Sequence, residues 1–357
     1  MTNRENVLKA LRREKPERIP FEFVLCPSKI EEFRNRTGET DYQEYYDFPI
    51  RYVELNPTMK KTDFSIYYKD LPENAEPLSW NPEWGVMSVK GTVAHFERML
   101  HPMEDFTTVE EIRSYPFPDF NDEYRWEGFE EKVNQLKKND LVAVAFMQMT
   151  IFEVAWYLRG MENLMIDMVC NPEMAEALLD ESTKIRTGMA QKYARYGIDI
   201  LMLGDDVSSQ QDMIMDPGMW RKLLKPRLAS VIAAAKSANP EILVFYHGDG
   251  NLQKIIPDLI EIGVDILNPV QPECMDPFLI KKLYGDKLSL WGTLGTQTTL
   301  PFGTPDEVKQ KCRELIEAIG KDGGLLLAPT HTIEPEVPWE NIQAFIDAVK
   351  EYGTFSI

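Results

Sequence analysis

The stretch Ile242-Leu-Val-Phe-Tyr-His-Gly-Asp-Gly-Asn251 decides how the rest of the chain is interpreted. Its first half, Ile242 to Tyr246, is apolar, β-branched and aromatic, which is typical of a buried strand. Its second half places His247 and Asp249 two residues apart, so both side chains point to the same side of an extended chain. Helix-forming residues follow from Leu252 to Ile262. A strand that ends in a polar pair and turns directly into a helix is typical of the C-terminal face of an α/β barrel, where such folds place catalytic residues.

The alternation of strand and helix recurs along much of the chain. Besides Ile242–Tyr246, we expect strands at Ile19–Leu25, Leu141–Phe146, Ile198–Leu203, Val264–Leu267, Leu288–Trp291 and in the run that ends at His331. Long helices between such strands imply a parallel sheet. Seven clear strands and one uncertain strand approach the eight of a closed barrel. We therefore predict an α/β protein, a TIM-type (β/α)8 barrel that spans residues 1–357 as a single domain. An open doubly wound sheet is the alternative, but no GxGxxG motif opens the first βα unit.

Residues 27–120 depart from this alternation. From Pro27 to about Ser79 the chain is polar, rich in aromatic residues and weakly periodic, which we interpret as short helices within a long excursion. Trp84 to Leu100 alternates as an antiparallel hairpin does, with a turn at Lys90-Gly91. We expect residues 27–120 to form an N-terminal insertion that covers the mouth of the barrel.

Composition excludes several classes of function. The formal net charge of −19 argues against a nucleic-acid groove, which needs a basic stripe. Neither a long apolar run nor the apolar core of a signal peptide is present, so we expect no membrane partner. The four cysteines are scattered and lack CxxC spacing, which indicates a cytoplasmic protein without a disulfide framework. A small-molecule substrate is expected, and self-association as a homodimer is left open.

Side chains that can carry chemistry gather where the predicted strands end. They are Glu22, Phe152, Glu153, Asp205, Asp206, His247, Asp249, Asn268, Gln271, Gln297 and His331. Two imidazoles and one carboxylate, from His247, His331 and Asp249, are enough to bind a divalent transition metal such as zinc and keep a position open for substrate. The candidate catalytic residues are Asp205, Asp206 and Glu153. The candidate substrate-binding residues are Glu22, Phe152, Gln271 and Gln297.

Several of these residues also have a purely structural interpretation. Each histidine could cap a turn, and Asp205 or Asp206 could be a metal ligand, a general base, a partner that orients a histidine, or the N-cap of the next helix. We expect Asp205 to face the pocket and Asp206 to pack near the helix start. Cys274 is either a spare thiolate ligand or a buried, inert cysteine.

Motifs along almost the whole chain together resemble the uroporphyrinogen decarboxylase superfamily, and within it the corrinoid-dependent methyltransferase-like branch. They are Asn3-Arg-Glu-Asn-Val-Leu8, Pro16-Glu-Arg-Ile-Pro20, Tyr157-Leu-Arg-Gly-Met-Glu-Asn-Leu164, Gly204-Asp-Asp206, Tyr246-His-Gly-Asp-Gly250, Ile262-Gly-Val-Asp-Ile-Leu-Asn-Pro-Val-Gln271 and Leu327-Ala-Pro-Thr-His331. The resemblance implies a TIM-type barrel with its site at the strand C-termini. True porphyrinogen decarboxylases hold substrate carboxylates with an arginine-rich segment after the first strand. Here that segment reads Phe21-Glu-Phe-Val-Leu-Cys-Pro-Ser28, so we do not expect a porphyrinogen substrate.

The methyltransferase branch carries zinc on a His-x-Cys pair and a later cysteine. The resemblance places His247, Asp249 and His331 at these positions, so nitrogen and oxygen replace sulfur. Harder ligands favour a metal that polarises the ether oxygen of a methoxylated aromatic compound over one that activates a thiol such as coenzyme M or homocysteine. The resemblance thus implies methyl transfer to a corrinoid on a partner protein. A decarboxylase or lyase acting on a small acid, and a non-catalytic ligand-binding barrel, are the alternatives.

Overall fold

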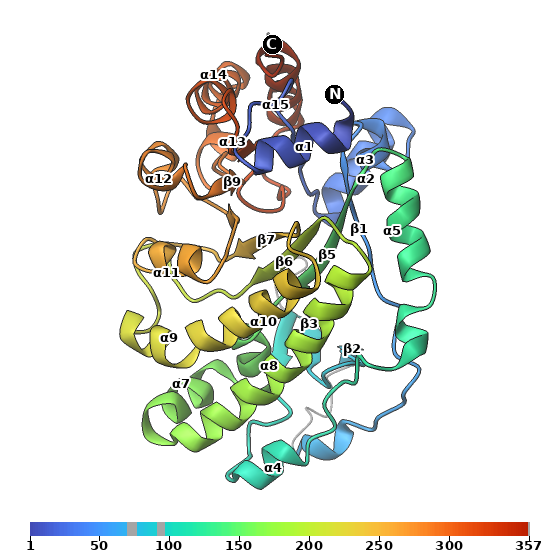
Figure 1. Ribbon diagram of the computed structural model, residues 1–357, viewed down its shortest axis with the longest axis vertical. Coiled ribbons are helices and arrows are strands. Elements are labelled where there is room, and N and C mark those ends of the chain that lie inside the picture. The colour runs from blue at the N-terminus through green and yellow to red at the C-terminus, as the bar shows by residue number, and fades with distance from the viewer. Residues whose placement is uncertain (70–76, 91–96, 356–357) are drawn as a thin grey trace.

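A computed structural model describes residues 1–69, 77–90 and 97–355 of the chain. Seven parallel strands form one sheet, and each strand after β5 pairs with the next one along the chain (Figure 1). In sheet order the strands are β1 (Ile50–Tyr52), β5 (Val142–Gln148), β6 (Ile200–Gly204), β7 (Leu243–His247), β8 (Ile266–Asn268), β9 (Ser289–Trp291) and β10 (Leu325–Leu326).

An eighth parallel segment adds to the β10 edge of this sheet. Phe21 pairs with Leu327, and Leu25 pairs with Ile333, through isolated parallel bridges. The same segment approaches the other edge, because the Tyr52 hydroxyl of β1 lies 3.5 Å from the Glu22 carboxylate and the rings of Phe21 and Phe48, which precedes β1, lie 5.5 Å apart. The sheet therefore curls until its two edges approach each other, as expected for a TIM-like barrel.

Helices follow the strands and lie outside the sheet (Figure 1). The helices that follow β5 to β10 are α6 (Phe152–Arg159), α7 (Met161–Cys170), α8 (Pro172–Arg195), α9 (Pro217–Leu223), α10 (Lys225–Ala238), α11 (Ile256–Glu261), α12 (Pro277–Tyr284), α13 (Thr299–Phe302), α14 (Pro305–Leu315), the π-helical turn η3 (Ile316–Gly320) and α15 (Trp339–Tyr352). The earlier helices are α1 (Asn3–Leu11), α2 (Pro27–Thr37), α3 (Tyr42–Tyr45), α4 (Val109–Arg113) and α5 (Phe129–Lys138), with 3₁₀ turns η1 (Ser65–Tyr67) and η2 (Glu123–Trp126). None of the described helices is long and apolar enough to cross a membrane.

The buried apolar side chains form two clusters, one inside the curled sheet and one between the sheet and the helices. Strand alternation sends one set of side chains inward and the other toward the helices. The inner cluster holds Val7, Leu8, Leu11, Ile50, Val142, Val144, Ile200, Met202, Leu243, Phe245, Ile266, Trp291, Leu326 and Ala328. The alternate residues of the same strands, such as Ala143 and Ala145 on β5, belong to the larger outer cluster. Residues of α1 therefore plug one end of the interior.

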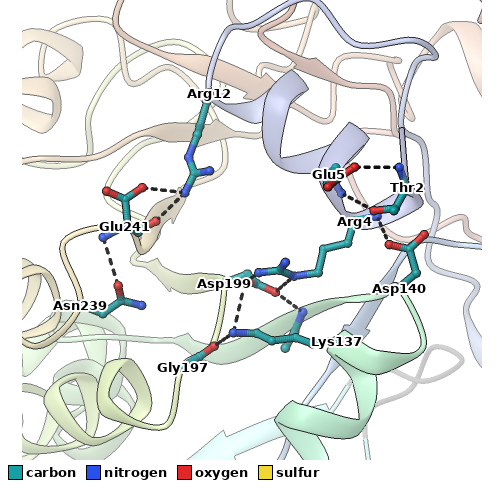
Figure 2. A network of polar contacts seen from close by, with 11 residues as sticks. Thr2, Arg4, Glu5, Arg12, Lys137, Asp140, Gly197, Asp199, Asn239 and Glu241 are labelled. Atoms are coloured by element: carbon teal, nitrogen blue, oxygen red, sulfur yellow. Dashed lines mark hydrogen bonds and ion pairs between the residues drawn. The ribbon is translucent and has the colours of Figure 1, made fainter.

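Polar contacts fasten α1 to the N-terminal ends of the strands (Figure 2). Arg4 donates to Asp199, which stands just before β6, at 3.0 Å, and Lys137 lies 3.6 Å from the same carboxylate. Arg12 pairs with Glu241, just before β7, at 3.2 Å. Because α1 closes this end, the opposite end, where the strands finish, is left for a site.

The stretch 27–120 is not a continuous excursion, because β1 lies within it and pairs with β5. A three-residue strand is too short to show alternation, which explains why we missed it. The predicted hairpin is present as β3 (Met87–Lys90) and β4 (Glu97–Leu100), which pair antiparallel and are joined by β2 (Pro77–Trp80) in a separate sheet. Its turn, from Gly91 onward, falls outside the described residues.

The described part of this insertion packs against helices that follow β5. The Met103 N–H donates to the Leu158 carbonyl of α6 at 2.9 Å, and the guanidinium of Arg186 on α8 lies 5.2 Å from the centre of the Trp84 ring. Coverage of the barrel mouth by this insertion stays a prediction.

Candidate metal centre and active site

Within the described part of the chain, three side chains that can bind a metal ion come together at the ends of β6 and β7. They are Asp206, His247 and Asp249, and each offers one ligand atom within 4.8 Å of the others. The His247 Nε2 atom lies 3.8 Å from Asp206 Oδ1 and 3.9 Å from Asp249 Oδ1. The Asp249 N–H also donates to Asp206 Oδ1 at 2.8 Å, so the backbone of one strand end holds the carboxylate of the other.

A glycine lets the two strand ends approach this closely. Gly204 is the residue in register with His247, and a Cβ at this position would lie 2.6 Å from the Cβ of His247. Such a distance is not tolerated, so a larger residue would push the His247 strand away. On the other side of the cluster, Gly250 has a φ of +89°, a conformation that favours glycine.

The hydrogen bonds of Asn268 prepare His247 for a metal ion. The Asn268 Nδ2 atom donates to the Trp291 carbonyl at 2.8 Å, which leaves Oδ1 to accept. His247 Nδ1 lies 2.6 Å from that oxygen and therefore carries the proton. The lone pair of the neutral imidazole is then on Nε2, the atom that faces the two carboxylates.

The Asp249 carboxylate is partly buried, and one of its oxygens is unsatisfied. Among the described residues, its Oδ1 atom is shielded from solvent and has no hydrogen-bond partner. Burial raises the pKa of Asp249, the charges of His247 and then His331 oppose the rise, and the negative charge of Asp206 adds to it. A buried, unpaired carboxylate oxygen is costly, and a bound cation would remove that cost.

Asp205 and Asp206 have roles opposite to those we expected. The Asp205 carboxylate is 4% exposed and accepts the backbone N–H groups of Ile151 and Glu153 at 3.0 and 2.9 Å. It therefore holds the start of α6, and burial raises its pKa to about 6. Asp206, which we assigned to a helix start, lies in the cluster instead.

Glu153 lies next to this cluster. Its carboxyl accepts the backbone N–H of Asp206, and burial, followed by the charges of Asp205 and Asp206, raises its pKa to about 9. Glu153 is thus a buried acid beside the three candidate ligands.

Comparison with known proteins identifies the family. Residues 2–352 match the family model described as Uroporphyrinogen decarboxylase (URO-D). The chain belongs to this family. A solved structure described as a methyltransferase from Methanosarcina mazei shares the fold, with a TM-score of 0.70 and 19% identity over 99% of both chains.

The curated relatives of this URO-D family member include proteins of two kinds. The methylated-thiol–coenzyme M methyltransferase of Methanosarcina mazei is 27% identical over 56% of this chain and 51% of its own length. The methylcobamide:CoM methyltransferase MtaA of Methanosarcina barkeri is 30% identical over 50% of both chains. The chain thus spans about half the length of these two relatives. A uroporphyrinogen decarboxylase of Christiangramia forsetii is 25% identical over 99% of both chains.

The structure brings some of the other predicted residues of this URO-D protein to the cluster. The Gln271 side chain accepts the Gly250 N–H at 2.7 Å and so supports the loop that carries Asp249. His331 is exposed and lies outside the group of three candidate ligands. Asp206, and not His331 as we expected, is the third member of that group. Cys274 donates to Gln271 at 3.5 Å, and burial raises the pKa of its thiol.

Two predicted substrate contacts are engaged elsewhere. Phe152 is fully buried in the outer cluster, because it lies in the first turn of α6, so the structure does not bring it to the site. Gln297 accepts a hydrogen bond from Gln210 at 2.7 Å on the surface. We did not anticipate Tyr52 and Trp291, which both donate to the carboxylate of Glu22. Alternation along the predicted β9 could have pointed to Trp291, whereas Tyr52 lies on the strand that we missed.

Proposed function

We propose that this protein is a corrinoid-dependent methyltransferase that moves a methyl group from a methoxylated, aromatic donor to a corrinoid carried by a partner protein. The names of two relatives, a methylated-thiol–coenzyme M methyltransferase and a methylcobamide:CoM methyltransferase, support methyl transfer. The observation that carries the proposal is the ligand set of Asp206, His247 and Asp249. It offers one nitrogen and two carboxylates and no sulfur, which suits a metal that acts on an oxygen.

The three residues fit a zinc ion, which is the metal we propose. Catalytic zinc takes three protein ligands and keeps one position for substrate. His247 presents an unprotonated Nε2, and Asp249 presents an oxygen without a hydrogen-bond partner among the described residues. When bound, zinc would act as a Lewis acid on the ether oxygen of the donor. We still propose that His331 acts at the site, beside the open metal position, because its charge acts on the pKa of Asp249.

The protein itself would position the donor and manage protons. Loss of a methyl group from an ether leaves an alkoxide or phenoxide, which needs a proton or a positive charge. We propose the Glu153 carboxyl as the proton donor for this part of the reaction, because the Asp206 N–H bonds to it and holds it beside the cluster, while the Asp206 carboxylate would bind the metal. For Asp205 we now propose a positioning role, because it holds the start of α6, and hence Glu153, in place.

A decarboxylase is the second candidate, because the relative from Christiangramia forsetii matches over almost the whole chain. A decarboxylase of this family needs cationic groups for its substrate carboxylates. The segment Phe21–Ser28, where such arginines would stand, contains none, and it carries Glu22 instead. This residue pattern favours the methyltransferase.

The experiment measures methyl transfer to a reduced corrinoid together with metal content. We expect about one zinc ion per chain, loss of activity on chelation and recovery with added Zn²⁺. His247→Ala should lose the metal and Asp206→Asn should weaken its binding, whereas Asp216→Asn, the same change at the exposed N-cap of α9, should retain it. Full activity after exhaustive chelation would contradict the metal site. Carbon dioxide release from a small acid without methyl transfer would favour the decarboxylase.

A further inference from the structure

Glu22 is a buried carboxyl group in the barrel interior whose partners are neutral side chains. It is 7% exposed and accepts hydrogen bonds from Trp291 Nε1 at 2.9 Å and from the Tyr52 hydroxyl at 3.5 Å. Trp291 and Tyr52 come from β9 and β1, so the three side chains meet across the interior. Among the described residues, the Glu22 carboxyl bonds only to neutral donors, which is unusual because buried acids are normally paired with a cation.

A continuous set of hydrogen bonds connects Glu22 with the metal cluster. The Trp291 indole donates to Glu22, and the Trp291 carbonyl accepts from Asn268 at 2.8 Å. Asn268 in turn accepts from His247. The Trp291 residue and the Asn268 carboxamide therefore link Glu22 to a proposed metal ligand.

Two exposed apolar side chains extend the inner rows of the sheet toward the mouth. Phe146 and Val24 continue the inward-facing rows of Val144 and Glu22 by alternation, and they are 47% and 43% exposed. The Phe245 ring packs edge-on against Trp291, with ring centres 5.1 Å apart. Exposed apolar side chains above one polar group are typical of a site for a flat ligand with one polar substituent.

We propose that the barrel interior selects methyl donors that are uncharged aromatic molecules, with Glu22 as the hydrogen-bonding anchor for a ring hydroxyl, and that it rejects donors carrying a carboxylate. This inference rests on the function proposed above, and it adds the class of donor and the residue that sets it. A substrate carboxylate beside Glu22 would face a like charge once Glu22 ionises, because the partners of Glu22 among the described residues are neutral. Like charges in a buried site repel strongly, so that ligand would pay a large electrostatic cost.

The protonation of Glu22 supports this role. Burial raises its pKa to about 7, against the effect of the Trp291 and Tyr52 hydrogen bonds. The titratable groups that face it are Tyr52 and, farther out, Tyr42, and burial raises the pKa of both, so they stay neutral at physiological pH. Glu22 therefore carries a proton in much of the population near neutral pH and loses it in mildly alkaline solution.

Calorimetric binding of a matched pair of ligands to the full chain tests the proposal. Near pH 8.5, where Glu22 is ionised, we expect 2-methoxyphenol to bind at least about tenfold more tightly than 2-methoxybenzoate. Between about pH 6 and pH 8.5 the affinity of the wild-type protein for the phenol should change, because Glu22 ionises. Glu22→Gln should bind the phenol within about threefold of the wild type but without this pH dependence, and Glu22→Leu should bind it about tenfold more weakly. Glu241→Gln, at the opposite end of the barrel, should behave as the wild type.

Three results would overturn the proposal. They are equal or tighter binding of the benzoate, no binding of either compound at millimolar concentration, and a pH dependence that persists in Glu22→Gln. The last comparison does not depend on whether Glu22→Leu folds. Tight, selective phenol binding without any methyl transfer would contradict the proposed function and leave this inference standing.

Discussion

At the scale of single residues, Asn268 sets the tautomer of His247, so the proposed metal affinity depends on a residue that does not touch the metal. Asn268→Ala would remove the acceptor for Nδ1–H and release the ring. We expect zinc affinity to fall about 10- to 100-fold, the usual effect of losing such a partner. Competition with a chromogenic chelator measures it, with Asn239→Ala at the other end of the barrel as the control. Unchanged affinity in Asn268→Ala would show that the tautomer does not matter.

Glu22 should also make the stability of the protein depend on pH. Its folded-state pKa of about 7 lies above the ordinary value of 4.5, so the folded state holds the proton more tightly than the unfolded state does. The resulting stability is fully present below about pH 4.5 and is lost as the pH rises through 7. Glu22→Gln removes this dependence. Relative to the variant, the wild type should lose up to about 3 kcal/mol between about pH 5 and pH 9.

Urea unfolding of both proteins at several pH values measures this difference. The carboxamide keeps an oxygen for the Trp291 indole, so the two proteins should have similar stability in acid. A stability difference that is constant with pH would show that Glu22 does not titrate as we infer.

At the scale of elements, the two adjacent aspartates after β6 serve different parts of the fold. Asp205→Asn leaves one carbonyl oxygen where a carboxylate accepted several N–H groups at the start of α6. We expect it to lower the free energy of unfolding by about 1–2 kcal/mol. Asp206→Asn should change stability little and weaken metal binding. Thermal unfolding and metal content of the two variants, measured in parallel, would separate the roles. The reverse pattern would restore our original assignment.

The sequence predicts the regular part of this fold well, because its strands are apolar and its helices are long. From β5 to β10 each expected strand is present, and His247 and Asp249 lie where their spacing predicts. The prediction failed where pattern carries little information. Strand β1, at one edge of the sheet, has only three residues. At the other edge, the described pairing of Ile19–Leu25 consists of isolated bridges, so neither edge segment shows a full apolar–polar alternation.

The candidate site was harder to predict than the fold. Strand β6 ends at Gly204, so alternation no longer decides which of Asp205 and Asp206 points inward. For His331, the regular part of β10 ends at Leu326, and the chain that follows leaves the histidine exposed and outside the ligand group. Phe152 belongs to the first turn of α6, and helix geometry turns its side chain toward the outer core. These outcomes depend on tertiary contacts that no local pattern contains.

At the scale of the whole molecule, the two ends of the sheet have different tasks. At one end α1 and its ion pairs close the interior, as Figure 2 shows, and at the other end the acidic and histidine side chains of β6 and β7 meet. We propose that the corrinoid of a partner protein reaches the donor from the second end. This division makes the open end the place where donor, metal and corrinoid would have to meet.

The most direct test of this account follows the methyl carbon itself. The purified protein is incubated with zinc, a reduced corrinoid protein and a methoxyphenol whose methyl carbon is labelled with ¹³C, and the products are identified by mass spectrometry. Our account predicts labelled methyl on the corrinoid and an equal amount of demethylated ring, with neither formed by His247→Ala. An unlabelled corrinoid and an intact donor, across a panel of methoxylated phenols and corrinoid proteins, would contradict it.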